Sequence, residues 1–340
     1  MSRQVKTADE LENRFVDDRV KVLIPKFEVL APYKRKKREE GDKNEGVEGW
    51  KYLAVREASI LKANYDEPLT CLRQITALKK ALKSAVKTHV KDHANESPVA
   101  TIITHFGEAL SFLFSEYTIA KNERYRGAVK ERSAPENRVE LDLSPFLKQA
   151  HEVLSAVKNG ASKEDIEWRD VSCALALVTG RRMGEIHLSG EFKFLGEYEV
   201  AFRGQLKGKS RKVKIEGSKV ALRDYEFPIP TLVRAELVTK GIEWLEANGK
   251  RFERDEDPER VNRRWSKVLS ERVRDEWSFM SEVTYHKFRG AYFRACVENA
   301  NVDPYDWEDF ARAVLGDDDS ATIKAYKRFV IKPGSVTRVL

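Results

Sequence analysis

The chain is poor in cysteine. Its 340 residues include only Cys71, Cys173 and Cys296. Three scattered cysteines are too few for a disulfide framework or for a zinc site. Each one lies in an apolar stretch with helical character, so we expect buried thiols in a reducing compartment.

Long apolar runs are also missing. The first residues contain no apolar signal region, and no run approaches the roughly 20 residues that cross a bilayer. The chain has neither an internal repeat nor a low-complexity tract. These absences predict a soluble, cytoplasmic protein without a membrane partner.

Charge is abundant and unbalanced. Lys and Arg total 62 against 55 Asp and Glu, which gives a net charge of +7, and the isoelectric point is about 9.1. This excess favours a polyanionic partner, although many soluble proteins carry a similar one. The length and an apolar content of 41% allow two domains with real cores.

Residues 7–119 show the pattern of helices joined by polar segments. Within Leu69–Val90, apolar residues recur at helical spacing while lysines fall on another face, so this helix is either solvated there or lies on a DNA backbone. The basic block Lys34–Arg38 is either a solvated loop or an arm that contacts phosphates. A helix over Ala109–Ala120 is expected to place its aromatic residues, Phe112 and Phe114 among them, in the core.

Apolar periodicity lapses over Lys121–Arg138, where charge is dense and Pro135 discourages a helix. We therefore place a linker at residues 131–140, between a helical domain at 1–130 and a second domain at 141–340.

The second domain combines helices with a few strands. Helices are predicted at Leu143–Lys158 and Ser162–Val178, and from Leu232 to Phe329. The alternating pattern between them predicts strands at Tyr198–Arg203, Lys212–Ile215 and Tyr225–Pro230. The expected fold class is mainly α with a small antiparallel β-sheet.

A candidate functional motif follows the apolar run Cys173–Val178. Gly180 is expected to bend the chain after a buried helix, and Arg181 and Arg182 stand at that bend. The guanidinium fork matches phosphate oxygens, so an arginine fixed at the edge of a core suits phosphodiester recognition. Such a turn is equally often a surface turn whose arginines are solvated.

Four further features follow in order, each with an ordinary alternative. Lys207 lies at the tip of an expected hairpin, where most lysines are solvated. His286 and Arg289 share one face of a helix, which is common on surfaces. Gly316 ends a helix before an acidic turn, as a cap would. Tyr326 lies among basic residues, where most tyrosines serve packing.

The order of these features resembles that of the tyrosine recombinases. Other details resemble one branch of them, the telomere resolvases (protelomerases) of linear phages and linear bacterial replicons. They are the doubled arginine, Phe202-Arg-Gly-Gln-Leu-Lys207, Val261-Asn-Arg-Arg264, Phe288-Arg-Gly-Ala-Tyr292 and Ala325-Tyr-Lys-Arg-Phe329. The resemblance covers about residues 139–332. It implies a tyrosine-recombinase (integrase) catalytic fold, preceded by a helical DNA-binding domain that is matched only in character.

The resemblance implies phosphoryl transfer without a metal or other cofactor. Tyr326 would attack a DNA phosphorus and form a 3′-phosphotyrosyl intermediate. Arg182 and Arg289 would donate to the non-bridging oxygens, where charge grows in the transition state. Lys207 would protonate the leaving 5′-oxygen, and His286 would support the phosphate or the proton relay.

Other basic residues are expected to contact DNA: Arg181, Arg263, Arg264, Lys209 and Lys287. Arg181 is expected to be structural or a backbone contact, because the family places the catalytic arginine at the fourth position of the motif. The sequence departs from the family at Asp317, where a histidine is usual, nine residues before the tyrosine. An ionised carboxylate would repel phosphate, so Asp317 is protonated, orients an arginine or leaves the role to a neighbour.

The leading interpretation is a telomere resolvase. A homodimer would cut both strands of double-stranded DNA at an inverted repeat and join each end to its complement, leaving closed hairpins. It would act in the cytoplasm of a bacterium or a phage-infected host, at the nucleoid. The alternatives are a site-specific integrase that exchanges strands between two duplexes and, because of Asp317, an inactive DNA-binding protein.

Overall fold

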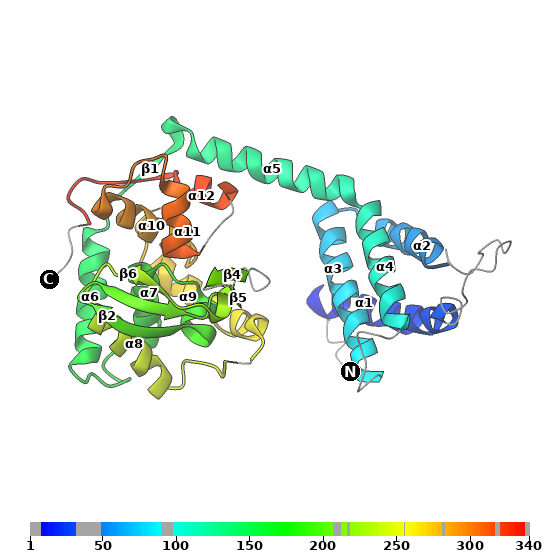
Figure 1. The fold of residues 1–340 in the computed structure, drawn as a ribbon, viewed down its shortest axis with the longest axis horizontal. Coiled ribbons are helices and arrows are strands. Elements are labelled where there is room, and N and C mark those ends of the chain that lie inside the picture. The colour runs from blue at the N-terminus through cyan, green and yellow to red at the C-terminus, as the bar shows by residue number, and fades with distance from the viewer. Residues whose placement is uncertain are drawn as a thin grey trace, which may run out of the picture. The chain divides into compact units, whose positions relative to one another are not determined.

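The structure, a computed structural model, describes residues 8–31, 49–89, 98–206, 212–215, 218–254, 256–280, 283–316 and 320–336. The chain divides into two compact units, residues 1–125 and 126–340 (Figure 1). No helix within the described ranges is long and apolar enough to cross a membrane.

The first unit is helical. Its elements are α1 (Ala8–Leu30), α2 (Gly49–Asn64), α3 (Pro68–His89), α4 (Pro98–Leu113) and the start of α5 (Ser115–Ser133). Helices α1 and α3 pack together, and α4 contacts α1, α2 and α3 (Figure 1). Phe27, Leu61, Leu82, Phe106 and Leu110 are fully buried between them. The helices predicted over residues 7–119 are confirmed, and α3 almost coincides with the predicted range.

One helix prediction in this unit is wrong. The chain breaks at Phe114, between α4 and α5, instead of continuing as one helix over Ala109–Ala120. Phe114 is fully buried, whereas Phe112 is 77% exposed. Residues two apart lie on different faces of a helix, so both rings cannot enter one core.

The expected linker is largely regular structure. Residues 131–140 hold the end of α5, the 3₁₀ turn η2 (Pro135–Asn137) and the start of β1 (Val139–Leu141). Val129 is the one buried residue of α5, so the lapse in apolar periodicity reflects a solvated helix. The division between the units falls inside α5, between Tyr125 and Arg126. The domain bounds inferred from the sequence stay a prediction.

The second unit packs helices around a small sheet. Its helical elements are α6 (Ser144–Lys158), α7 (Trp168–Thr179), the π-helix η3 (Glu185–Ser189), the 3₁₀ turn η4 (Leu222–Asp224), α8 (Ala235–Ala247), α9 (Pro258–Glu276), α10 (Lys287–Ala300), α11 (Trp307–Leu315) and α12 (Ser320–Tyr326). Its strands after β1 are β2 (Glu191–Gly196), β3 (Glu199–Arg203), β4 (Lys212–Ile215), β5 (Ser218–Ala221), β6 (Phe227–Pro230) and β7 (Phe329–Ile331).

The strands form three small sheets. The central one is antiparallel in the order β2–β3–β6, and β4 and β5 form an antiparallel pair. The fold class, mainly α with a small antiparallel sheet, is confirmed, as are the three predicted strands. The pattern did not reveal β2 or β5, and the predicted helix over Ser162–Val178 begins only at Trp168, after a turn.

The third sheet closes the unit. Strands β1 and β7 pair in parallel, with Val139 opposite Phe329 and Leu141 opposite Ile331. Strand β7 follows α12 directly, so this pairing fixes the chain just after Tyr326 to the chain that enters the unit.

Helix α7 forms the centre of the core. All its residues from Asp170 to Thr179 are buried. At its start, the Asp170 carboxylate accepts hydrogen bonds from Arg272 of α9 at 2.7 and 2.5 Å and from the Trp277 indole at 2.9 Å. At its end, Gly180 adopts a left-handed conformation with φ +65°. The Gly180 bend predicted from the sequence is confirmed.

Gly180 allows a test of this packing. A Cβ atom there would lie 2.2 Å from the Tyr292 ring, whereas Gly160, at φ +90°, has open space around it. We expect Gly160→Ala to destabilise by about 1 kcal/mol through backbone strain alone. Gly180→Ala should lose about 3 kcal/mol or more, because strain and overpacking add. Urea unfolding measures both, and equal losses would contradict the close approach of Tyr292.

Candidate active site

Three of the predicted catalytic residues meet at one pocket. The pocket has a volume of about 360 Å³, and Arg182, His286 and Arg289 all line it. They come from the turn after α7 and from the start of α10. These residues, which lie up to 107 positions apart in the sequence, thus converge on one pocket. Its other lining residues are Arg181, Met183, Gly184, Leu206, Pro258, Asn262, Ser266, Ser270, Thr284 and Tyr285.

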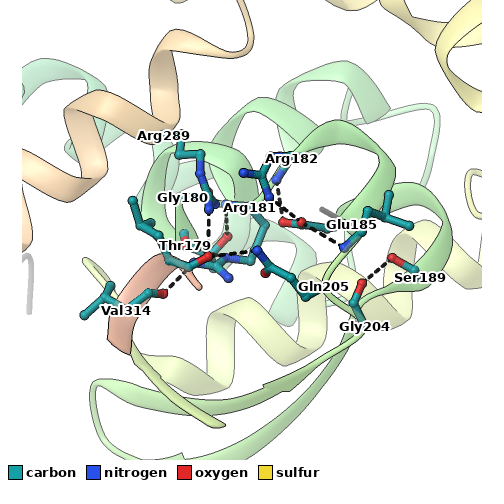
Figure 2. Close-up of polar contacts among 12 residues, drawn as sticks. Thr179, Gly180, Arg181, Arg182, Glu185, Ser189, Gly204, Gln205, Arg289 and Val314 are labelled. Atoms are coloured by element: carbon teal, nitrogen blue, oxygen red, sulfur yellow. Dashed lines mark hydrogen bonds and ion pairs between the residues drawn. The ribbon is translucent and has the colours of Figure 1, made fainter. Parts of the chain in front are cut away.

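Arg182 is held by a buried carboxylate. Its Nη1 lies 2.9 Å from Glu185 Oε1, and its backbone N–H donates to Glu185 Oε2 at 3.0 Å (Figure 2). Glu185 is fully buried. Burial opposes its ionisation, but the charges of Arg182, Arg289 and Arg181 outweigh burial and lower the pKa of Glu185. An anionic Glu185 therefore orients Arg182 and offsets part of the positive charge.

Arg289 is anchored by two backbone carbonyls. Its side chain is 1% exposed, and its guanidinium donates to Gly180 O and to Leu315 O, each at 2.7 Å. Figure 2 shows this guanidinium beside the Gly180 turn. The ends of α7 and α11 therefore both contact Arg289, in the first turn of α10.

Arg181 is turned into the protein. It is 1% exposed, donates to Val314 O at 2.7 Å, and its guanidinium carbon lies 4.7 Å from the centre of the Phe202 ring. Burial, followed by the charge of Arg289, lowers the pKa of Arg181 to about 10. This position favours the structural role over the expected DNA contact.

Tyr326 does not line the pocket. The residue ends α12 and is 6% exposed. Its ring lies 5.3 Å from that of Phe293, centre to centre. It also packs on Gly290, where a Cβ atom would come within 3.1 Å of the Tyr326 ring. The Tyr326 ring is thus packed in the core against α10, at Gly290, the residue that follows Arg289.

Some predicted site residues lie outside the described residues. They are Lys207, Lys209, Asp317 and the basic block at 34–38. Leu206, which precedes Lys207, lines the pocket, and its backbone N–H donates to Glu185 at 3.3 Å. The chain therefore approaches the pocket just before Lys207.

The remaining predicted DNA contacts lie on α9 and at the start of α10. Arg263 and Arg264 are exposed, and Lys287 is half-buried. The Arg264 guanidinium stacks over Trp265 at 4.9 Å and over Phe252 at 5.6 Å, measured to the ring centres. Stacking on aromatic rings holds a cation in place without removing its charge.

Two features of this site are not evident from the sequence. One face of α9 carries Pro258, Asn262, Ser266 and Ser270 into the pocket. Their spacing of four residues is visible in the sequence, but nothing there shows which face of α9 turns inward.

The second feature is a buried polar chain behind Tyr285. His187 Nδ1 lies 2.7 Å from Lys250 O, so Nδ1 carries the proton and Nε2 accepts from Ser172 Oγ at 2.7 Å. The Tyr285 hydroxyl in turn lies 2.8 Å from Ser172 Oγ. Burial lowers the pKa of His187 to about 4, so the ring stays neutral. This chain anchors the turn that carries His286.

Comparison with known proteins agrees with this geometry. Residues 137–329 match the sequence model of the telomere resolvase ResT/TelK catalytic domain. The chain belongs to this telomere resolvase family. The match spans the turn after α7, both residues of the His-x-x-Arg pair and Tyr326.

Individual telomere resolvases are similar over parts of their length. The protelomerase of Escherichia phage N15 is 27% identical over 219 residues, which are 61% of this chain and 34% of that protein. The protelomerase of Klebsiella oxytoca phage phiKO2 is 31% identical over 166 residues, 46% of this chain and 25% of that protein. The chain thus matches about a third or less of the length of these relatives.

Two solved telomere resolvases share the fold. Protelomerase TelA, covalently complexed with substrate DNA, aligns with a TM-score of 0.60 at 17% identity, over 92% of this chain and 95% of its own. Protelomerase TelK, complexed with substrate DNA, aligns with a TM-score of 0.52 at 19% identity, over 94% of this chain and 60% of its own. The fold is therefore that of these protelomerases.

Replacing Glu185 tests the buried charge balance. Since the folded state lowers the pKa of Glu185, its contribution to stability is present above the unfolded value of about 4.3 and is lost as pH falls through the folded value. We expect Glu185→Gln to cost about 3–5 kcal/mol at pH 7, because the arginines lose their buried counter-charge.

The expected loss should shrink as the pH falls below the unfolded value, because the unfolded chain then takes up a proton that the folded carboxylate, with its lowered pKa, does not. Urea unfolding of both proteins between pH 3 and pH 7 provides the measurement. A deficit of the variant that stays constant across this range would show that Glu185 is not a stabilising anion.

Proposed function

We propose that the chain is a telomere resolvase that breaks and rejoins DNA through a 3′-phosphotyrosyl bond. The observation that carries the proposal is the convergence of Arg182, His286 and Arg289 on one pocket, in a chain of the ResT/TelK family. Two guanidiniums and an imidazole around a cavity match the charge of a pentacoordinate phosphate.

The proposed reaction exchanges one phosphoester for another. The Tyr326 oxygen forms a bond to phosphorus, and the bond from phosphorus to the 5′-oxygen breaks. Arg182 and Arg289 stabilise the charge on the non-bridging oxygens, and Lys207 gives a proton to the leaving 5′-oxygen. His286 supports the phosphate or the proton relay. Attack by a 5′-hydroxyl of the complementary strand reverses the chemistry and seals a hairpin.

The nucleophile has to move for this reaction. Tyr326 packs on Phe293 and is almost fully buried. We therefore propose that α12 shifts when DNA enters, so that the hydroxyl reaches the phosphorus. A phenol left in the core would also keep the site inactive until substrate is bound.

The proposed partner is double-stranded DNA with an inverted repeat, bound by a homodimer. Arg263, Arg264, Lys209 and Lys287 would contact its backbone, and Arg181 would be structural. The proposed setting is the nucleoid in the cytoplasm of a bacterium or a phage-infected host. The integrase alternative is not favoured, because the matching family and relatives are telomere resolvases.

A plasmid assay tests the activity. The protein is incubated, without added metal, with a plasmid bearing the inverted-repeat junction of its own replicon. We expect linear products whose ends return to duplex after heat denaturation, as closed hairpins do. Recombinants between two plasmids would instead indicate an integrase, and tight binding without either product would support an inactive DNA-binding protein.

The nucleophile is tested by Tyr326→Phe. We expect the covalent protein–DNA adduct to disappear while DNA binding stays within about twofold, because the phenyl ring keeps the packing and loses only the reacting oxygen. Tyr305→Phe is the matched control, since Tyr305 is 95% exposed. Denaturing gel electrophoresis detects the adduct, and an adduct that persists in Tyr326→Phe would exclude the assignment.

A further inference from the structure

Gln205 is a buried polar residue to which the reaction above gives no role. It follows Gly204, whose φ of +109° and lack of a side chain let β3 turn closely beside Ser189. The Gly204 N–H donates to Arg223 O at 3.0 Å, and Gly204 O accepts from Ser189 Oγ at 2.5 Å. The backbone that carries Gln205 is therefore fixed on both sides.

The amide of Gln205 reaches the end of α11. Its Nε2 donates to Leu315 O at 3.0 Å, the same oxygen that accepts from Arg289 at 2.7 Å. Arg181 donates to the preceding carbonyl, Val314 O. The last carbonyls of a helix have no partner within it, and here three side chains from three segments supply the donors (Figure 2).

Gly316 packs against the Gln205 amide at the same place. It ends α11 in a left-handed conformation, with φ +68°, and a Cβ atom on it would lie 3.0 Å from Gln205 Nε2. The amide thus packs flat against the residue where the chain leaves α11 toward α12 and Tyr326.

Gln205 differs from the other two donors in its charge. An incoming phosphate attracts the Arg289 guanidinium. Its oxygens compete with Leu315 O for the same N–H groups, so the hydrogen bond from Arg289 to Leu315 O weakens. A neutral amide has much less attraction for phosphate. Gln205 can therefore keep the end of α11 in place while Arg289 binds the substrate.

The second amide atom argues against a role in stability alone. Gln205 Oε1 is buried and has no hydrogen-bond partner among the residues that the structure describes. An unpaired buried acceptor destabilises the fold by about 1–3 kcal/mol, so a side chain chosen only for packing would be apolar here.

We propose that Gln205 is a positioning residue, which holds the carbonyl end of α11 and thereby sets where α12 presents Tyr326 to the phosphate. This inference rests on the proposed function, because it concerns the step in which Tyr326 attacks.

Gln205→Met tests the proposal. Met has a similar length and removes both the donor and the unpaired acceptor, so the thermal midpoint should stay within about 3 °C of wild type. We expect the single-turnover rate of adduct formation to fall about 10- to 100-fold, with DNA affinity within about twofold, because misplacing the nucleophile affects the chemical step.

Gln74→Met is the matched control. Gln74 is also buried, and its Oε1 has no partner within the described part of the chain, but it lies on α3 in the first unit. Wild-type and Gln74→Met rates should agree. If Gln205→Met forms adduct as fast as these two, the positioning role is overturned while the proposed function stands. If wild type forms no adduct at all, the proposed function itself fails.

A substrate with sulfur in place of the leaving 5′-oxygen separates two roles. A thiolate leaves without a proton, so this substrate bypasses the general acid. The defect of Gln205→Met should persist on it, because Tyr326 still has to be positioned. Full recovery of the rate would overturn the proposal and assign Gln205 to the Lys207 segment instead.

Discussion

The second unit depends on how it neutralises buried positive charge. Arg181 and Arg289 are almost fully buried, and Glu185 is the carboxylate that lies among the arginines of the motif. The rest of the compensation comes from backbone carbonyls at the ends of α7 and α11. Helix C-termini carry partial negative charge, so they suit guanidiniums. The turn after α7, the start of α10 and the end of α11 are therefore stable only together.

This mutual dependence explains what the sequence could predict. The Gly180 bend, the helices around it and the short strands follow from local patterns, and the family motifs bring Arg182, His286 and Arg289 together. Glu185 lies three residues after Arg182, where the sequence has helical spacing but nothing that marks this side chain as buried. The chain instead forms a π-helix over Glu185–Ser189. A carboxylate that must face inward gives no local signal.

Long-range contacts account for the rest. Nothing near Gln205 in the sequence indicates that its amide meets Leu315, 110 residues later. The sequence does not reveal the position of Tyr326 either, because that position depends on the space that Gly290 leaves for the rings of Tyr326 and Phe329. The lapse of apolar periodicity over Lys121–Arg138, which led to the predicted linker at residues 131–140, has a related cause. Apolar periodicity arises from burial on one face, and the exposed helix α5 has little of it.

The parallel pairing of β1 with β7 has a consequence for the motion of the nucleophile. Along the chain, α12 lies between the end of α11, whose last carbonyl accepts hydrogen bonds from Gln205 and Arg289, and strand β7, which pairs with β1. We therefore expect α12 to rotate or shift between these two contacts when Tyr326 moves to the phosphate. Exchange of α12 with a neighbouring subunit would require the β1–β7 pairing to separate first.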